Sequence, residues 1–312
     1  MDVASKAYFA PKVEAGYNEK TQHPPAPEHL MDQMESPKLV SIHGGHSGEF
    51  CSHATDTLEE IIVAYAEQGF HWAGITEHIP PVDDRFVYPE ETKAGLDARS
   101  LYRRFERYIT SCRRLQRKHA AAIKIYVGIE TEYYSGSIPH LRNLIHRFEP
   151  DYIMGSVHHV EDIGFDYSAE TYAQAVSAAG NVEALYCRYF DAQHQLISEI
   201  RPPVVGHFDL IRIYDPDYIS HLELPAVRKK VHRNLELIRR LGLILDMNAR
   251  ALVKGGSEPY PTRSILEQAV KLGIPLVPGD DSHSVESAGL YIDQVIELLV
   301  EVGANTNWRR PA

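Results

Sequence analysis

Six stretches of the sequence end an apolar run with a histidine or an acidic residue. The side chains at these ends are His43 and His46, Glu77 and His78, Glu130, His158, His207, and Asp281 and His283. Imidazole nitrogens and carboxylate oxygens are the ligands that divalent cations such as zinc, iron and manganese take in proteins. Each apolar run is typical of a strand, and neighbouring parallel strands deliver the residues that follow them to one rim. The sequence therefore predicts a metal site assembled from distant parts of the chain.

The first pair of histidines is separated by Gly44 and Gly45. The glycines allow a tight turn of the backbone, so that His43 and His46 could both face one ion. The alternative is a glycine-rich turn that carries two surface histidines. His53 follows in the loop FCSHAT, where the local pattern is typical of polar surface.

Alternation of side chains along a strand selects among the next candidates. We expect His78 rather than Glu77 to face the site, and His158 rather than His159. Glu130 ends an apolar run, and a buried carboxylate without a partner would be costly, so a metal or an arginine must accompany it.

The remaining candidates follow the later strands. His207 follows VVG and could equally be a core histidine bonded to a carbonyl. Asp281 and His283 lie two residues apart and share a face, which is a stronger local signal. Glu132, two positions after Glu130, is a weaker candidate.

Strands and helices alternate along the chain from Lys38 onward. The expected strands are residues 38–43, 70–76, 123–130, 151–157, 203–208, 243–248 and 274–279. The expected helices are residues 57–69, 97–121, 138–146, 168–200 with a break at Gly180-Asn181, 226–242, 262–273 and 285–303. Apolar strands that alternate with amphipathic helices indicate a parallel sheet covered by helices.

The fold class that this pattern predicts is α/β, a seven-stranded TIM-like (β/α) barrel whose active site lies at the carboxyl-terminal ends of the strands. No G-x-G-x-x-G follows the first strand, which disfavours a dinucleotide-binding fold. We expect residues 1–36, which include HPPAPEH, to form an extended or disordered tail, and residues 37–312 to form a single barrel domain.

Composition limits the function and the location. The formal net charge of −11 argues against a nucleic-acid partner, which would require a basic surface. Cys51, Cys112 and Cys187 are widely spaced and include no CxxC pair, so neither a disulfide framework nor a thiolate zinc site is predicted. The sequence shows no secretory signal and no apolar run of membrane-spanning length, and we expect a cytoplasmic protein without membrane partners.

These residues, in this order, resemble the PHP (polymerase and histidinol phosphatase) family, and most closely its histidinol-phosphatase branch. The resemblance extends over roughly Lys38 to Gly303. Its landmarks are HGGHSGEF with SHAT, TEHIP with YPEE, GIE, GSVHH, GHFDLIR, KGGSEPYPTRSILEQAVKLGIPL and GDDSH.

The resemblance implies a distorted seven-stranded barrel that holds two or three divalent cations (zinc, iron or manganese). The family's ligand pattern falls on His43, His46, His53, His78, Glu130, His158, His207, Asp281 and His283. One departure is visible, because the family opens with two histidines separated by one residue, whereas HGGH separates them by two. A bulge at Gly44-Gly45 would restore the geometry; otherwise one of the two histidines does not bind metal.

The activity that the resemblance implies is hydrolysis of the phosphate monoester of L-histidinol phosphate, a step of histidine biosynthesis. Clustered cations would activate a bridging water as hydroxide, neutralise the phosphoryl oxygens and align the attack. The predicted catalytic residues are Asp281, His283 and Arg212, and the predicted phosphate-binding residues are Arg212, Arg250, Lys254 and Arg263. Arginine suits phosphate because its planar guanidinium binds two oxygens together.

Other functions remain open at this stage. The same site could act on a different small phosphate ester, such as a sugar phosphate or a nucleotide, or the barrel could bind metal without catalysis. A metal-dependent amidohydrolase would carry a bridging lysine after a middle strand, and no middle strand here ends in lysine.

Overall fold

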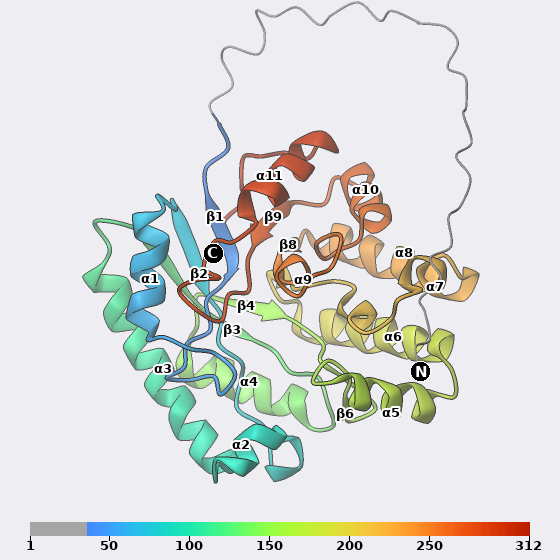
Figure 1. Cartoon of the computed structure of the whole chain (residues 1–312), viewed down its shortest axis with the longest axis horizontal. Coiled ribbons are helices and arrows are strands. Elements are labelled where there is room, and N and C mark those ends of the chain that lie inside the picture. The colour runs from blue at the N-terminus through green and yellow to red at the C-terminus, as the bar shows by residue number, and fades with distance from the viewer. Residues whose placement is uncertain (1–35) are drawn as a thin grey trace, which may run out of the picture. The chain divides into compact units, whose positions relative to one another are not determined.

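Seven parallel strands form one curved sheet in the computed structural model, which describes residues 36–312 (Figure 1). The strands are β1 (Val40–Gly44), β2 (Trp72–Ile75), β3 (Lys124–Glu130), β4 (Tyr152–Gly155), β7 (Val204–Val205), β8 (Ile244–Asn248) and β9 (Leu276–Gly279), in the spatial order β1-β2-β3-β4-β7-β8-β9. The backbone N–H groups of Asp280 and Asp281, which follow β9, donate to the carbonyl of His43 in β1, over 3.0 and 2.7 Å. The sheet therefore curves into a nearly closed barrel, and the predicted fold class and its seven strands are confirmed.

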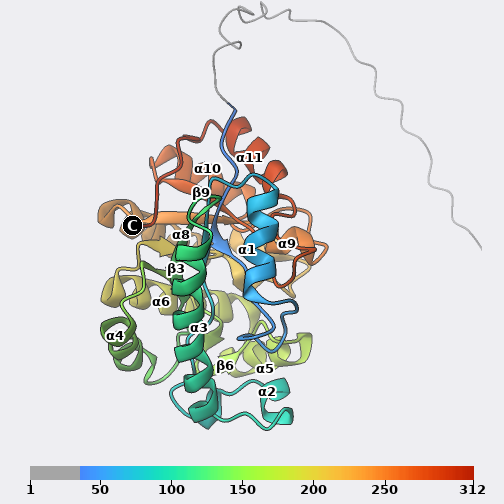
Figure 2. The same ribbon diagram turned by 90° about the vertical axis from the view of Figure 1, so that its left-hand side faces the viewer.

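Helices follow the strands and lie around the outside of the barrel. They are α1 (Leu58–Glu67), α2 (Pro89–Lys93), α3 (Ala98–Lys118), α4 (Ser137–Phe148), α5 (Ala169–Ala179), α6 (Val182–Ile200), α7 (Tyr218–Leu222), α8 (Pro225–Leu241), α9 (Arg250–Val253), α10 (Arg263–Lys271) and α11 (Ile292–Glu301). Helices α1 and α3 cover one side of the strands, and α6 and α8 lie together on the other (Figures 1 and 2). The predicted break between α5 and α6 is present, and the side chain of Asn181 caps α6.

Several elements differ from the sequence-based expectation, among them the short helices α2, α7 and α9, which were not predicted. A short antiparallel hairpin, β5 (His159–Val160) with β6 (Ile163–Gly164), follows β4 and was not predicted. The last helix was expected to begin at residue 285, but α11 begins at Ile292. Gly289 and Tyr291 have φ angles of 75° and 65°, and the Gly289 N–H donates to the carboxylate of Asp280 instead of to a helical carbonyl. A helix cannot pass through residues in this left-handed conformation.

The barrel interior is filled by one apolar cluster to which every strand contributes. Its members are Val40, Ile42, Trp72, Tyr126, Tyr152, Met154, Val204, Ile244 and Val277. Two larger apolar clusters pack the helices against the outside of the sheet. Because full burial of one such side chain stabilises the fold by about 1.5–3 kcal/mol, these clusters hold the strand ends in fixed positions.

Strand β1 contains a bulge near the position where the sequence departs from the family pattern. Ser41 pairs with Ala73 and Gly44 pairs with Ile75, so three steps along β1 match two steps along β2. A side chain on Gly44 would place its Cβ 2.5 Å from the carbonyl oxygen of Gly74, so only glycine fits there. The irregularity lies between Ser41 and Gly44, at the start of the HGGH stretch, and not at the Gly44-Gly45 step where a bulge was expected.

The described residues from Pro37 to Ala312 form one compact unit. The tail expected for residues 1–36 lies, apart from Ser36, outside the described residues. Among residues 36–312, none of the helices is long and apolar enough to cross a membrane.

Candidate metal centre

Five histidines surround the carboxylate of Glu130, the last residue of β3. The distances from a ring nitrogen to a Glu130 oxygen are 3.4 Å for His43, 3.6 Å for His46, 3.3 Å for His78, 3.3 Å for His158 and 2.9 Å for His207. These histidines belong to, or directly follow, β1, β2, β4 and β7. The structure thus brings together side chains that are up to 164 positions apart in the sequence (207 − 43).

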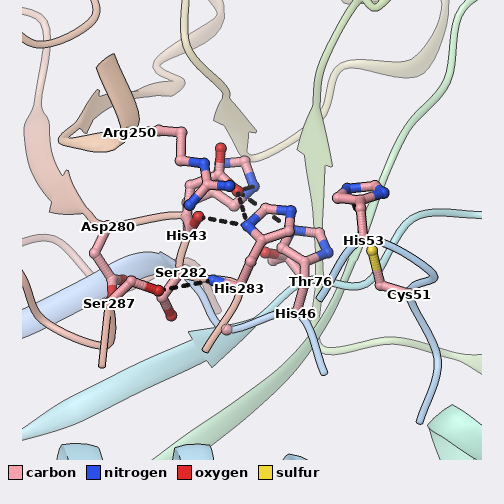
Figure 3. Close-up of polar contacts among 12 residues, drawn as sticks. His43, His46, Cys51, His53, Thr76, Arg250, Asp280, Ser282, His283 and Ser287 are labelled. Atoms are coloured by element: carbon pink, nitrogen blue, oxygen red, sulfur yellow. Dashed lines mark hydrogen bonds and ion pairs between the residues drawn. The ribbon is translucent and has the colours of Figure 1, made fainter. Parts of the chain in front are cut away.

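Asp281 and His283, which follow β9, complete this cluster. Asp281 Oδ1 lies 3.4 Å from His46 Nε2 and 3.9 Å from His43 Nε2. The His283 ring stacks on the His46 ring with centroids 4.5 Å apart (Figure 3). The loop after β9 therefore faces the same space as the end of β1.

His53 lies at the edge of the cluster. Its side chain is 44% exposed, and its Nδ1 is 3.7 Å from a carboxylate oxygen of Glu90. Its ring is 4.8 Å from the His283 ring, and its Nε2 is 3.3 Å from the sulfur of Cys51 (Figure 3). Of the nine predicted ligands, His53 has the most exposed side chain.

Four groups of side chains in the cluster could hold a metal ion, because their ligand atoms lie within 4.8 Å of one another. They are His43, His46 and Glu130; His43, His207 and Asp281; His78, Glu130 and His158; and His46, Cys51, His78 and His283. Residues are shared between the groups, so the geometry suits a few cations close together rather than four separate sites. His53 belongs to none of the groups found within residues 36–312.

The chemistry of these side chains fits cations. Several buried ring nitrogens have no hydrogen-bond partner within residues 36–312. They include Nε2 of His43 and both ring nitrogens of His46. A buried polar atom without a partner costs about 1–3 kcal/mol, and a bound cation would supply the missing partner. The Nε2 atoms of His43 and His46 face the carboxylates of Glu130 and Asp281 in the cluster, which a structural core histidine would not require.

Three buried carboxylates lie behind the histidines. Asp246 Oδ2 is 3.2 Å from His43 Nδ1, Glu77 Oε2 is 3.3 Å from His46 Nδ1, and Glu132 Oε2 is 3.1 Å from His158 Nδ1. A carboxylate at one nitrogen of the imidazole orients the ring and makes the opposite nitrogen a better metal ligand.

Sequence reasoning missed Asp246 and set Glu77 aside. The available signal was the carboxylate of Asp246 in the middle of the apolar run LILDMN. Glu77 is only 2% exposed, and its Oε1 accepts a hydrogen bond from the Ser47 N–H over 2.8 Å. It faces His46 although alternation along β2 had favoured His78 alone.

The electrostatics of the cluster favour positive charge. Burial raises the pKa of Glu130, but the neighbouring His43, His78 and His158 hold that pKa well below its usual value. Burial lowers the pKa of His43, but Glu130 and Asp281 hold it well above its usual value. Burial lowers the pKa of His283 to about 3, together with the charge on His46. Carboxylates that stabilise protons on these rings would stabilise metal cations in the same place.

A cleft of about 450 Å³ opens onto the cluster. Its walls include Glu130, His207 and Asp281 together with two basic residues, Arg250 and Lys254. Both basic residues were predicted to bind phosphate, and both face the space next to the candidate ligands.

Arg212 and Arg263, which were also predicted to bind phosphate, are not among the residues that line the cleft. The guanidinium of Arg212 is buried between the rings of Tyr218 and Tyr260, and Nη2 donates to the carbonyls of Glu258 and Pro259 over 3.0 and 2.8 Å. These contacts favour a role in holding Tyr260, which lines the cleft, over a direct contact with phosphate.

Arg263 lies at the start of α10, outside the cleft. Its side chain is 50% exposed and forms ion pairs with Glu267 and Glu301. We therefore leave Arg263 out of the candidate phosphate site.

A second pocket adjoins the cleft, and the two share His53 and His78 as wall residues. Its other walls are mostly aromatic and aliphatic, with three carboxylates, Glu77 among them. They include Phe86, Tyr88, Tyr134, Leu101, Phe105, Glu91 and Glu132. The cavity could accept a flat ring and a positive charge next to the candidate metal centre.

Comparisons with known proteins agree with this geometry. Residues 44–250 match the model of the PHP domain family. A probable histidinol-phosphatase from Schizosaccharomyces pombe is 36% identical over 255 residues, which cover 80% of this chain and 82% of that protein.

Solved structures show the same fold. A putative histidinol phosphatase from Listeria monocytogenes aligns with a TM-score of 0.73 and 26% identity, over 82% of this chain and 99% of its own. A histidinol phosphate phosphatase from Lactococcus lactis, in a complex with zinc, L-histidinol and phosphate, aligns with a TM-score of 0.67 and 20% identity, over 86% of this chain and 95% of its own.

Proposed function

We propose, from the premise that this chain belongs to the PHP family and to its histidinol-phosphatase branch, that it is a metal-dependent phosphatase that hydrolyses L-histidinol phosphate to L-histidinol and phosphate. The observation that carries the proposal is the cluster of five histidines around Glu130, in a cleft that also contains Arg250 and Lys254. The relative from Schizosaccharomyces pombe supports the substrate.

The proposal includes two or three divalent cations. The proposed ligands are His43, His46, His53, His78, Glu130, His158, His207, Asp281 and His283. Imidazole and carboxylate together accept zinc, iron or manganese, and zinc is present in the structure from Lactococcus lactis. Glu130 belongs to two of the four ligand groups, so it would help to hold more than one cation.

Bound cations would lower the pKa of water toward neutrality and offset the negative charge of the phosphoryl group. Side chains of the cleft would hold the phosphate group in place. Arg250 and Lys254 would bind phosphate oxygens in the cleft and stabilise the charge that develops during hydrolysis. Asp281 and His283 line the same cleft as Glu130, and we keep them in the proposal as residues of the reacting centre.

The neighbouring cavity would hold the remainder of the substrate. Tyr88 and Tyr134 offer flat apolar surfaces to an imidazole ring, and Glu91 and Glu132 offer carboxylates to an ammonium group. The Tyr88 hydroxyl donates to Glu132 Oε1 over 3.4 Å, which leaves the other side of this carboxylate facing the histidines. A simple phosphate ester would leave this cavity unused.

We also propose a cytoplasmic location and a small-molecule substrate rather than a nucleic acid. Cys51, Cys112 and Cys187 are free thiols, which a reducing compartment preserves. The net charge of −11 opposes the binding of a long polyanion.

A phosphate-release assay tests the proposal. Purified protein loaded with zinc or manganese is expected to hydrolyse L-histidinol phosphate with a kcat/KM at least about 100-fold above that for p-nitrophenyl phosphate, because only the former fills the second cavity. A matched assay with a sugar phosphate and a nucleotide tests the alternative substrates. Equal rates on all four esters would contradict the substrate assignment, and no turnover by fully loaded protein would contradict the phosphatase itself.

A further inference from the structure

The loop between β1 and α1, residues 45–57, is fixed against the loop that follows β9. The His46 N–H donates to the Ser282 carbonyl over 2.7 Å, and the Thr55 N–H donates to the His283 carbonyl over 2.8 Å. These two bonds hold both ends of the loop segment, and Cys51 lies between them. The Cys51 N–H donates to the Ser47 carbonyl over 2.8 Å, which turns the thiol inward.

Cys51 is surrounded by histidines rather than by apolar side chains. Its sulfur lies 3.3 Å from His53 Nε2 (Figure 3). Cys51 also belongs to the ligand group that contains His46, His78 and His283. The residue is 5% exposed, but within the described residues it is a member of none of the three apolar clusters.

Cys112 provides a comparison within the same chain. It is fully buried and belongs to the apolar cluster between α3 and the sheet, as is typical of a cysteine that serves only as a small hydrophobic residue. Cys51 is buried like such a residue, but it does not belong to an apolar cluster.

His46 supplies an independent observation. Its side chain is fully buried, and neither ring nitrogen has a hydrogen-bond partner among the described residues. His53, in contrast, is 44% exposed and stands outside every ligand group. The side chains that converge beside His283 are therefore those of His46, His78 and Cys51.

We propose that Cys51 is a thiolate ligand of one cation in this centre, and that it joins His78 and His283 there, beside His53. The inference rests on the proposed metal-dependent function and adds a sulfur ligand to it. Thiolate and imidazole together favour zinc or iron over magnesium or manganese at this site. The other groups, built from imidazole and carboxylate, do not share this preference.

Cobalt substitution tests the inference without reference to activity. The full chain is stripped with a chelator, loaded with Co²⁺ and examined by absorption spectroscopy and elemental analysis. Wild-type protein is expected to show a sulfur-to-cobalt charge-transfer band in the near ultraviolet. Cys51→Ser is expected to lose this band and about one equivalent of cobalt, because one ligand set loses its sulfur.

Two variants serve as controls. Cys187→Ser, on α6 and away from the cluster, should keep the band. Cys112→Ala, in the apolar cluster between α3 and the sheet, should keep it as well. Retention of the band in Cys51→Ser would overturn the inference.

The unmutated protein gives a second measurement that does not depend on how a variant folds. X-ray absorption of the zinc-loaded chain should show sulfur at about 2.3 Å from zinc, at roughly one sulfur for every two or three zinc ions. Stoichiometric zinc with nitrogen and oxygen ligands alone would overturn the thiolate ligand and leave the proposed phosphatase intact. A chain that binds no stoichiometric zinc or cobalt would overturn both.

Discussion

The two ends of the barrel are built from the same seven strands but have opposite chemistry. The interior toward the amino-terminal ends is apolar and receives a side chain from every strand, including Ile42, Met154 and Ile244. The carboxyl-terminal ends carry buried histidines and carboxylates around Glu130. Along one strand, one to four residues separate a side chain that stabilises the fold from a side chain that serves the site, as for Ile42 and His43 or Met154 and His158.

The two ends of the barrel contribute to the stability of the fold with opposite signs. Each buried polar atom without a partner at the carboxyl-terminal end costs about 1–3 kcal/mol, whereas each apolar side chain in the interior contributes a similar amount. The apolar end thus offsets the cost of holding the polar end in place before cations bind. Variants at the two ends should accordingly affect different measurements.

Glu130→Gln should have the largest effect on activity. The substitution removes a charge shared by five histidines, and we expect kcat/KM for L-histidinol phosphate to fall by about a thousandfold or more, which corresponds to ~4 kcal/mol of transition-state stabilisation. Steady-state kinetics with metal in excess measures this loss. Circular dichroism should show the same fold as wild type, and a variant with near-normal activity would remove Glu130 from the centre of the site.

Ile244→Ala tests the apolar, amino-terminal end of the barrel, where Ile244 begins β8. The side chain is 1% exposed in the barrel interior, and its truncation should destabilise the protein by about 2–5 kcal/mol through a cavity. Thermal unfolding should show a melting temperature lower by about 5 to 15 °C. Below that temperature the metal content and kcat should stay close to wild type. A loss of bound metal from folded Ile244→Ala would show that the two ends are not independent.

Arg250→Ala should weaken the phosphate end of the site. Loss of a charged hydrogen-bond donor costs about 1.5–3 kcal/mol, so kcat/KM should fall by about 10- to 100-fold without a change in metal content. Arg263→Ala is the matched control, because its exposed ion pairs lie outside the cleft. Equal losses in the two variants would indicate a general effect of surface charge.

Asp246→Asn should weaken metal binding at His43. Asp246 orients the His43 ring from behind, and removal of such a partner typically lowers metal affinity or activity by about 10- to 100-fold. Metal-binding titration should show the weakening at a cation site that includes His43. Glu236→Gln, which breaks an exposed ion pair with Arg239, should leave the titration unchanged.

The strands and the strand-end histidines could be predicted because each depends on a local pattern. Apolar runs of four to eight residues followed by a polar residue indicate both the strand and the end that faces the site. The bulge at Gly44 was visible only as an unusual spacing, since its form depends on pairing with Ala73 and Ile75 in β2.

Other features depend on contacts between distant segments and left no local signal. Cys51 reaches the cluster only because its loop bonds to Ser282 and His283, more than 200 positions away. Arg263 appeared suited to phosphate by type, but Glu267 and Glu301 engage it elsewhere. Asp246, in contrast, did leave a local signal, because a carboxylate inside an apolar strand requires a buried partner.

Metal removal and return measures the central claim most directly. Chelator-treated, dialysed protein is assayed for phosphate release from L-histidinol phosphate while zinc or manganese is titrated back. We expect no measurable turnover at first, followed by a rise that reaches its plateau at two or three cations per chain. Full activity in the metal-free protein, or a plateau with no bound cation, would contradict the account.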